Sequence, residues 1–320
     1  MAGNSALNKA GIKKEDEFYT QLSDIEKELK HYREQFRDRI IFCNCDDPAE
    51  SNFFRYFQLN FYSLGIKKLI CTHFDREKPT YKLEIISDGG SSDGNNIPEY
   101  IRTELQGNGD FRSPECLKIL EEADIVVTNP PFSLFHEFLS VLLEHDKKFL
   151  IIGSQNNITY KDIFPLLRDG KVWLGYYAGD MAFMVPDYYE PRATRFWIDE
   201  TGQKWRSFGN MCWFTNLDIN KRHEDLILYR KYQKDDYRFF DNYDAIFIEK
   251  VADIPMDYEG VMGVPITFLY KHNPDQFEII GLLAGNIKGL AGIPSKIGKD
   301  GPYLDGKLKY GRILIRRKVK

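Results

Sequence analysis

The sequence lacks several features that would each have indicated a class of protein. No apolar run approaches the roughly 20 residues that a membrane-spanning helix needs. The five cysteines are odd in number, and most lie in apolar, strand-like runs, which favours a reduced protein over a disulfide framework. The polar start, MAGNSALNKAGIKKEDE, contains no secretory apolar stretch. We therefore expect a cytoplasmic protein.

Several catalytic signatures are missing as well. The chain has no Gly-x-Ser-x-Gly elbow and no phosphate-loop motif. Cys43 and Cys45 are one residue apart and His73 is near in sequence, but a second pair of zinc ligands at suitable spacing does not follow. We expect no metal site.

Charge is distributed unevenly along the 320 residues. The net charge is -4, yet the stretch from Ile279 to Lys320 contains ten lysines or arginines and only two acids, Asp300 and Asp305. Such a basic end could follow a phosphate backbone. The alternative is a solvated basic strand and tail.

Strand and helix patterns alternate through the first half of the chain. Continuous apolar runs predict buried strands at RIIFCNC, KKLICTHF, YKLEII, DIVVTN and KFLIIGS, with helical periodicity between them. Ser23 and Glu26 form a capping-box pattern at the first helix, and Ser133 is expected to open a later one. The alternation predicts a doubly wound, mostly parallel α/β sheet, whose ligands bind beyond the carboxyl ends of the strands.

The pattern changes after about Val172. Aromatic, alternating segments such as TRFWIDETGQKWRSFGNMCWFTNL predict antiparallel hairpins. We expect an N-terminal helical segment over 1–38, a catalytic core over 39–215 and a mixed α/β region over 216–320.

The sharpest motif is Asn129-Pro130-Pro131-Phe132, directly after the strand DIVVTN. The side-chain oxygen of Asn129 and the carbonyl of Pro130 can both accept hydrogens from an exocyclic amine, and the two prolines hold the turn rigid. Phe132 could stack on a flat substrate ring. The alternative is an ordinary turn after a strand, where Asn-Pro is common.

This motif resembles the catalytic (Asn/Asp)-Pro-Pro-(Tyr/Phe) signature of the amino-methyltransferases. Asp16-Glu17-Phe18-Tyr19-Thr20 looks like the Phe-Tyr-Thr element of many adenine methyltransferases. CNCDDPAESNFFRYF, MGVPITFL, NPDQFEIIG and YGRILIRRK are similar to segments of the EcoRI-type adenine-specific DNA methyltransferases. The resemblance extends from Asp16 to Lys318, in the gamma-like motif order with the target-recognition region last.

The resemblance implies a class I, Rossmann-like methyltransferase with a C-terminal DNA-recognition region. Such an enzyme transfers a methyl group from S-adenosyl-L-methionine to the exocyclic amine of an adenine flipped out of double-stranded DNA. It would modify DNA in a restriction-modification or phage-defence system, with a cognate restriction endonuclease as a possible partner, or act as an orphan methylase. No membrane is expected as a partner.

The resemblance and the strand ends together suggest the cofactor site. Asp46 or Asp47 could accept from the cofactor's ammonium, although an Asp there could instead cap a helix, and the Gly-rich turn usual at this position is missing. Asp75 follows the second strand, where an acid commonly accepts from ribose hydroxyls, but it could also be a plain loop acid. By position, the loop Gly107-Asn108-Gly109-Asp110-Phe111 matches the family's adenine-contacting loop, with Asp110 receiving the adenosine amine, and the alternative is a plain turn. The expected cofactor-binding residues are Phe18, Tyr19, Thr20, Cys43, Asn44, Asp46, Asp47, Asp75, Asp110, Phe111 and Asn129, and the catalytic residues are Asn129, Pro130, Pro131 and Phe132.

Candidate DNA contacts come from two places. Arg192 and Arg195 lie within a dense aromatic stretch, some of whose rings could line a pocket for an extruded base while most belong to the core. Lys288, Lys296 and Lys299 lie in a Gly-rich stretch of the basic end. The alternatives to this function are a methyltransferase of RNA or of a protein glutamine, whose amide nitrogen poses the same chemical problem, and a non-catalytic DNA-binding subunit of a defence system.

Overall fold

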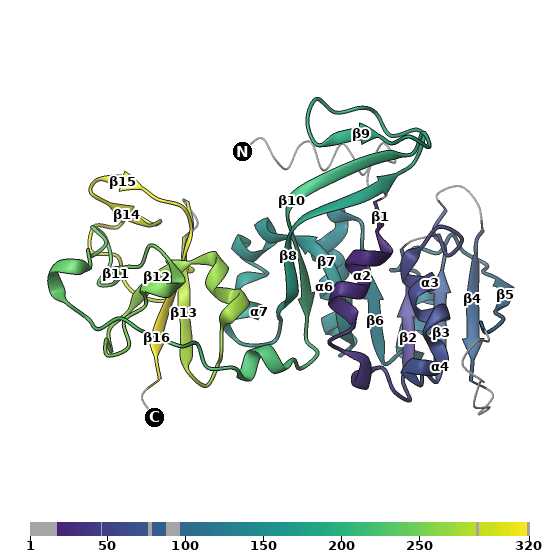
Figure 1. The fold of residues 1–320 in the computed structure, drawn as a ribbon, viewed down its shortest axis with the longest axis horizontal. Coiled ribbons are helices and arrows are strands. Elements are labelled where there is room, and N and C mark those ends of the chain that lie inside the picture. Colours follow the sequence, from purple (N-terminus) through teal and green to yellow (C-terminus); the bar gives the residue numbers. More distant parts are fainter. Residues whose placement is uncertain (1–17, 46, 76–78, 88–96, 286–287, 319–320) are drawn as a thin grey trace. The chain divides into compact units, whose positions relative to one another are not determined.

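The computed structural model describes residues 18–45, 47–75, 79–87, 97–285 and 288–318, and the statements below concern these residues (Figure 1). The chain folds into two compact units. The first contains residues 1–155 and 175–217, and the second contains 156–174 and 218–320. Residues 156–174 thus belong to the second unit although they lie between two segments of the first in sequence. The chain therefore crosses between the units three times.

The first unit is organised around a sheet of ten strands within the described residues, in the order β1-β8-β10-β7-β6-β2-β3-β4-β5, with β9 paired to β10. The strands are β1 (Tyr19–Thr20), β2 (Ile40–Cys43), β3 (Lys68–Thr72), β4 (Tyr81–Ile86), β5 (Ile101–Glu104), β6 (Ile125–Thr128), β7 (Lys148–Ser154), β8 (Trp173–Val185), β9 (Phe196–Ile198) and β10 (Lys204–Thr215).

Strand direction changes from the centre of this sheet to its edges. The central strands β3, β2, β6 and β7 are parallel to one another, whereas β4 and β5 on one side and β10 on the other run antiparallel to their neighbours. The central strands are apolar and buried, as expected for strands covered on both faces. Their carboxyl ends, at Cys43, Thr72 and Thr128, therefore lie at one edge of the sheet.

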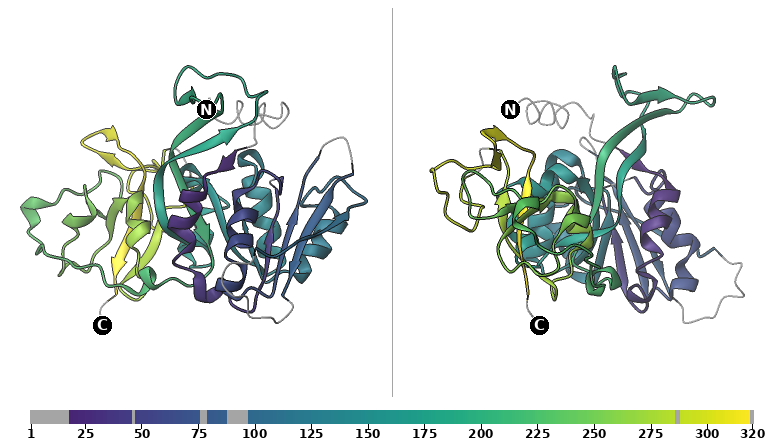
Figure 2. Two further views of the ribbon diagram at one scale, coloured as in Figure 1. Left: turned by 45° about the vertical axis from the view of Figure 1, so that its right-hand side comes forward. Right: turned by 60° about the vertical axis from the view of Figure 1, so that its left-hand side comes forward.

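Helices lie on both faces of the sheet, as the views in Figure 2 show. In the first unit they are α2 (Leu22–Leu29), α3 (Asn52–Leu59), α4 (Phe61–Leu64), α5 (Pro114–Glu122) and α6 (Phe135–Glu144), with short 3-10 turns at Arg33–Gln35 and Phe132–Leu134. A further 3-10 turn, Gln155–Thr159, follows β7, and all of it except Gln155 belongs to the second unit.

Two helix starts differ from the sequence expectation. Helix α2 begins at Leu22 with Gln21 as its N-cap and without a side-chain cap, so the capping box of Ser23 and Glu26 does not form. The Gln21 side chain instead donates to the carbonyl of Ala182, because β1 pairs with β8 immediately before the helix. Ser133 lies inside a 3-10 turn, and α6 starts after Leu134.

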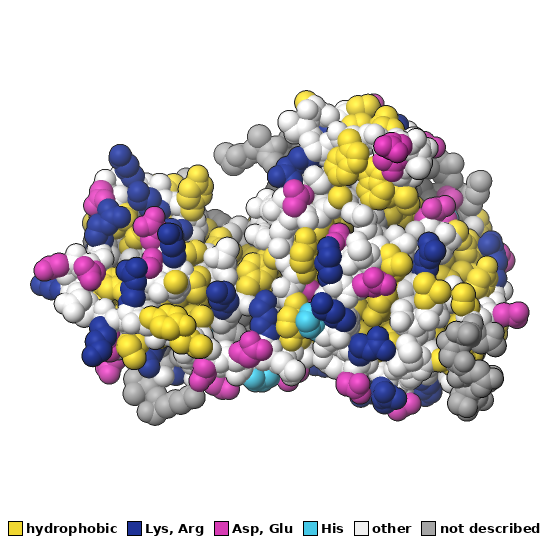
Figure 3. All heavy atoms as spheres, in the orientation of Figure 1, with side chains coloured by type: hydrophobic (Ala, Val, Ile, Leu, Met, Phe, Trp, Pro, Cys, Tyr) yellow, Lys and Arg dark blue, Asp and Glu magenta, His cyan; other side chains and the backbone are white. Residues whose placement is uncertain are grey.

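Strands β8 and β10 are long enough to extend past the sheet as a hairpin that carries β9 (Figures 1 and 2). The β9–β10 pairing confirms the hairpin expected from the alternating aromatic sequence. Trp197 stacks on Trp205 with ring centroids 6.2 Å apart, and the Trp205 indole donates to Asp199. Figure 3 shows hydrophobic side chains gathered on this hairpin, where Trp197 and Ile198 are exposed.

The second unit has its own sheets and core. Its four-stranded sheet has the order β11-β12-β16-β13, and a two-stranded sheet pairs β14 with β15. Both β12 and β13 run antiparallel to β16, and a β-bulge interrupts the β13 register between Ile279 and Gly281. The elements are α7 (Phe164–Arg168), β11 (Ile246–Phe247), β12 (Met262–Pro265), β13 (Phe277–Leu283), β14 (Tyr303–Leu304), β15 (Lys307–Leu308) and β16 (Arg312–Arg317), with 3-10 turns at Asn220–His223, Lys234–Asp236, Val251–Asp253 and Ile266–Lys271.

Part of the second unit's core gathers side chains from far apart in the sequence. Phe240, Tyr243, Leu283 and Leu314 are buried in one cluster of this unit. No helix among the described residues combines the length and apolar character needed to cross a membrane.

Candidate active site

The Asn-Pro-Pro-Phe motif directly follows β6, at the edge where the parallel strands end. Asn129 is buried, with 4% of its surface exposed, and its Nδ2 donates to the carbonyl oxygen of Phe18 at 2.6 Å. This hydrogen bond fixes the orientation of the amide. The other end of the amide, Oδ1, is buried without a hydrogen-bond partner in the described structure. The side chain therefore presents a fixed and unused acceptor.

Phe132 lies in a cluster of aromatic rings. Its ring stacks on that of Phe18, with centroids 5.0 Å apart and planes 14° apart. Phe183 from β8 and Phe208 from β10 meet Phe132 edge-on at 5.8 and 5.7 Å. Both partners lie on the long hairpin strands, so the hairpin rises from the aromatic surroundings of the motif.

Four buried side-chain oxygens around this edge have no hydrogen-bond partner among the described residues. They are Asn129 Oδ1, Asn44 Oδ1 after β2, Thr72 Oγ1 at the end of β3, and Thr20 Oγ1 in β1. Nearly all buried polar atoms in folded proteins find a partner, so four such oxygens at one edge indicate a polar ligand. The backbone carbonyls of the same region are satisfied: Thr20 accepts from Asn52 at 2.7 Å, and Asn44 from the Thr128 hydroxyl.

Asp47 stands in a polar cluster after β2. Its Oδ1 accepts from the Tyr81 hydroxyl at 2.8 Å, and its Oδ2 lies 3.5 Å from Nε2 of His73. Nδ1 of His73 is 2.6 Å from the Thr80 hydroxyl. The carboxylate is partly exposed, so it is held in place by β4 and still reaches solvent.

The loop at Gly107–Phe111 packs against the end of β3. The Asp75 amide donates to the carbonyl of Asn108 at 2.9 Å. Gly109 has a φ of +76°, and a Cβ there would lie 1.9 Å from the carbonyl oxygen of His73. Glycine is therefore required for this close approach, which brings Asp75 and Asp110 to the same edge.

Asp110 is engaged by Arg112. The guanidinium donates to both carboxylate oxygens of Asp110, at 3.0 and 2.8 Å. It also donates to the carboxylate of Glu137 at 2.7 Å. Hydrogen bonding to Arg112 lowers the pKa of Asp110, and partial burial opposes that shift. Phe111 is buried against Phe138 of α6. The carboxylate is thus ionised and oriented, with capacity left to accept one more hydrogen.

The chain matches known proteins over almost its full length. A family model described as adenine-specific methyltransferase EcoRI covers residues 6–318. The Type II methyltransferase M.EcoRI of Escherichia coli is 46% identical, with 99% of this chain and 98% of that protein covered. The chain belongs to the EcoRI family of adenine-specific methyltransferases.

Two further relatives of this chain come from mycoplasmas. Type II methyltransferase M.MgeORF184P of Mycoplasma genitalium is 39% identical over 97% of this chain, and M.MpnI of Mycoplasma pneumoniae is 38% identical over 98%, each with 98% of the relative covered. The expected family and the Rossmann-like α/β fold are confirmed, and the chain is a DNA adenine methyltransferase.

A methyltransferase requires a methyl donor, and the residues at the sheet edge fit S-adenosylmethionine. Its ammonium and ribose hydroxyls could satisfy the buried oxygens of Thr20, Asn44 and Thr72. The acids Asp47 and Asp75 suit its positive charge. Among the other expected cofactor residues, Cys43 is buried in β2, Tyr19 pairs with Met184 of β8, and Asp46 lies outside the described residues.

Of the DNA-contact candidates, Arg192 and Arg195 lie in the first unit on the segment between β8 and β9. Arg195 adopts a φ of +55° and its Nη1 pairs with Asp180 at 2.9 Å, while the Arg192 guanidinium lies 5.6 Å from the centroid of the Tyr189 ring. Both side chains are exposed.

The candidates Lys288, Lys296 and Lys299 lie in the second unit. All three are exposed; Lys296 is 3.6 Å from Asp244, and Lys299 lies 5.7 Å from the centroid of the Tyr303 ring. These arrangements leave their ammonium groups accessible to a phosphate.

Sequence reasoning missed two residues of the site. Thr72 ends β3, and its position at a strand end was the only available signal. Arg112 follows the Gly107–Phe111 loop, and nothing in the sequence pairs it with Asp110 rather than with solvent. Phe183 was visible only as a member of the dense aromatic stretch, and Phe208 only as part of a segment expected to form hairpins.

Proposed function

We propose that this methyltransferase transfers the methyl group of S-adenosyl-L-methionine to the exocyclic amine of an adenine flipped out of double-stranded DNA. The sulfonium of the bound cofactor supplies the methyl group. The chain must then hold the amine, draw on its hydrogens and exclude water, and each of these tasks falls to residues at the carboxyl edge of the sheet.

The observation that carries the proposal is the fixed amide of Asn129. Nδ2 is anchored on Phe18, so Oδ1 is the atom left to accept a hydrogen from the amine. The carbonyl of Pro130 would accept the second hydrogen. Together they move electron density onto the amine nitrogen as it becomes tetrahedral, and the two prolines fix both acceptors before the substrate arrives.

The adenine ring would stack on Phe132. One face of that ring is covered by Phe18 in this structure, and the two remaining contacts with Phe183 and Phe208 are edge-on. A flipped base would therefore use the other face of Phe132 or take the place of the Phe18 ring. In the cofactor site, Asp47 would accept from the ammonium, Asp75 from the ribose and Asp110 from the adenosine amine.

The biological role that we propose is protective modification of cytoplasmic DNA. The relatives' names mark type II systems, and in such a system a cognate restriction endonuclease would recognise the same DNA sequence. An orphan methylase would carry the same chemistry without that partner.

Methyl transfer to different acceptors tests the proposal. Purified protein with tritiated S-adenosylmethionine is expected to label double-stranded DNA, and digestion with nuclease and phosphatase should release the label as N6-methyldeoxyadenosine. Labelling of RNA or of a protein glutamine instead would assign the chain to another substrate, and cofactor binding without labelling of any DNA would favour a non-catalytic subunit. Long-read methylation mapping in cells expressing the chain would then give the target sequence.

A further inference from the structure

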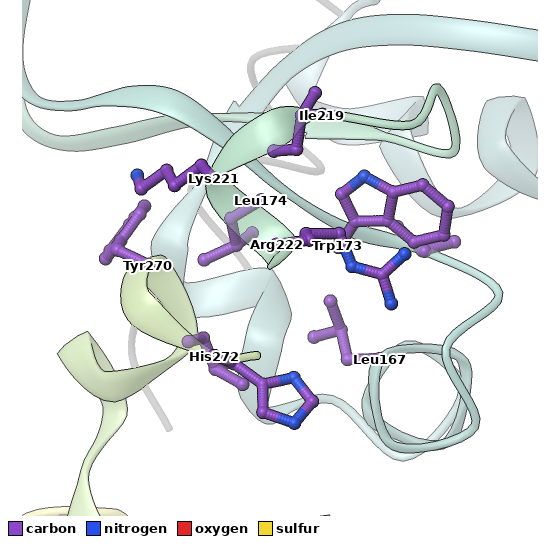
Figure 4. A pocket seen from close by; sticks show the side chains of 10 residues that line it. Leu167, Trp173, Leu174, Ile219, Lys221, Arg222, Tyr270 and His272 are labelled. Carbon is purple, nitrogen blue, oxygen red and sulfur yellow. The ribbon is translucent and has the colours of Figure 1, made fainter. Parts of the chain in front are cut away.

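Arg222 occupies an unusual environment inside the second unit. It lies in the 3-10 turn Asn220–His223, and the centre of its guanidinium is 3.7 Å from the centroid of the Trp173 ring. Figure 4 shows the guanidinium beside the indole, with Leu167 on the side of the guanidinium away from Trp173. Stacking on an aromatic face fixes the plane of the guanidinium and so the directions in which its N–H groups point.

The hydrogen-bonding capacity of this guanidinium is largely unused. Its Nε is buried and has no hydrogen-bond partner in the described structure, and none of the ion pairs found there involves Arg222. Burial lowers the pKa of Arg222, opposed only by the more distant charges of Asp218 and Asp275. Arginine side chains that are half-buried usually meet a carboxylate or another acceptor, so this one is built to receive an anion.

Two cavities of the second unit share Arg222 and His272 in their walls. The first has a volume of about 20 Å³, and the second is an open cavity of about 560 Å³. The open cavity is also lined by Lys318 after β16 and by Gly170, whose added Cβ would lie 3.7 Å from Nη2 of Arg222. A ligand in the open cavity can therefore approach the guanidinium from solvent.

The charges along the open cavity leave an excess of positive charge. Its two acids already have arginine partners: Asp169 is 2.7 Å from Arg168, and Glu278 is 3.9 Å from Arg316. No such partner is found in the described structure for Arg222 or Lys318. The pKa of the nearby His272 is lowered by burial, and the positive charges of Arg222 and Lys318 lower it further.

We propose that Arg222, held on Trp173, is the receptor for a phosphate group, with Lys318 as a second cation at the cavity mouth. A guanidinium offers two parallel N–H donors that match two phosphate oxygens, and the stacked geometry already holds those donors in place. The phosphate is a phosphodiester of the DNA substrate. This assignment rests on the proposed function, because it makes the second unit a contributor to DNA binding.

DNA affinity measured against salt concentration tests the proposal. Each phosphate contact contributes about -0.9 to the slope of log affinity against log salt, so Arg222→Gln should flatten the slope by about one unit. Affinity at about 0.1 M salt should fall about tenfold, the usual loss for a hydrogen bond to a charged group. Arg222→Lys should keep the slope and lose affinity, because it retains the charge without the paired donors.

Two further variants control for the loss of charge and for misfolding of Arg222→Gln. Arg238→Gln is the matched control, since it removes the same charge from the same unit at a guanidinium already paired with Asp305 at 2.6 Å. Its salt slope should equal that of the wild type. If Arg222→Gln does not fold, as judged by its thermal unfolding, Lys318→Gln takes its place, because Lys318 is exposed and should also flatten the slope.

A second arm distinguishes the source of the phosphate. Inorganic phosphate is added without DNA, with chloride at equal ionic strength as the reference, and the unfolding midpoint is recorded. A midpoint raised in the wild type but not in Arg222→Gln, together with unchanged DNA binding, would place a free phosphate compound in the cavity and overturn the DNA assignment. Identical slopes and midpoints in both proteins would overturn the site itself. Methylation of DNA by the wild type is measured in parallel, so a failure of the proposed function is seen separately.

Discussion

The side-chain amide of Asn129 donates to the backbone carbonyl of Phe18 across 111 positions of sequence, at a distance of 2.6 Å. This hydrogen bond joins the Phe-Tyr-Thr element to the Asn-Pro-Pro-Phe motif. It also decides which end of the amide is available, since Oδ1 has no partner among the described residues. The Phe-Tyr-Thr element thus orients the side chain of Asn129, the proposed catalytic acceptor. This is in addition to the role that the element is expected to have in binding the cofactor.

Removal of that acceptor should affect turnover far more than cofactor binding. Asn129→Ala is expected to lower kcat by on the order of a hundredfold or more, because one preorganised transition-state contact contributes roughly 3 kcal/mol. The dissociation constant for S-adenosylmethionine should stay within a few fold of the wild-type value. Single-turnover methylation and calorimetric cofactor titration measure the two quantities. Near-normal turnover in this variant would remove Asn129 from the mechanism.

The ring of Phe132 should contribute through stacking. Phe132→Ala is expected to reduce turnover and weaken specific DNA binding, since stacking of a base on an aromatic side chain contributes about 1–3 kcal/mol. Phe132→Tyr and Phe132→Trp retain a ring and should be milder. Binding of DNA containing 2-aminopurine at the target position reports whether the base still leaves the duplex. Equal defects in the Ala and Tyr variants would show that the ring does not stack on the base.

Much of the sheet could be predicted from the sequence, because buried parallel strands are continuous apolar runs. The segment DIVVTN predicted β6 and placed Asn129 at its carboxyl end. The antiparallel direction of β4 was not anticipated. The connection from β3 to β4 covers residues 73–80, which is shorter than the dozen or more residues that a parallel crossover needs. The length of this loop could therefore have predicted that β4 runs antiparallel to β3.

Other features depend on tertiary packing that no local pattern encodes. The start of α2 is set by the pairing of β1 with β8, which is about 160 residues away, and this pairing overrode the capping pattern at Ser23. The burial of the Thr72 hydroxyl and the ion pair between Arg112 and Asp110 depend on how strands and loops pack in the folded protein, so no local sequence pattern predicts them. The roles of these residues toward the cofactor stay predictions.

The Arg112–Asp110 pair gives cofactor binding a pH dependence that can be predicted in sign. Asp110 accepts a hydrogen bond from the adenosine amine most strongly while it is ionised, and Arg112 keeps its pKa below the ordinary value. Wild-type cofactor affinity should therefore be insensitive to Asp110 between about pH 7 and pH 5. In Arg112→Gln the pKa of Asp110 rises, because the hydrogen bonds and charge of the guanidinium are lost while burial and the backbone hydrogen bond from residue 112 remain. As pH is lowered, affinity in the variant should therefore begin to decline at a higher pH than in the wild type.

Calorimetric titration of S-adenosylmethionine at several pH values measures this difference. Arg37→Gln is a suitable control, since Arg37 pairs with Glu34 ahead of β2 in the same unit and its replacement removes the same charge. Superimposable pH profiles for the wild type and Arg112→Gln would exclude Asp110 as an ionised cofactor contact.

The exposed lysines of the basic end should bind phosphates rather than only keep the protein in solution. The reason is the excess of ten basic residues over two acids after Ile279 in a chain of net charge -4. Their ammonium groups are exposed, and the Lys296–Asp244 pair is too solvated to hold its lysine firmly. Neutralising Lys288, Lys296 and Lys299 together should flatten the salt slope of DNA binding by up to roughly three units.

A second triple variant makes the result interpretable. Lys161, Lys231 and Lys234 are also exposed lysines of the second unit, so changing them to glutamine removes the same charge from the same unit outside the basic end. That protein should keep the wild-type slope, and cofactor affinity should be unchanged in both triples because the proposed cofactor site lies in the first unit. An unchanged slope in the Lys288, Lys296 and Lys299 variant would show that these lysines form a solvated surface. The main phosphate contacts would then have to be sought at Arg192 and Arg195, where the corresponding double variant should flatten the slope by up to about two units.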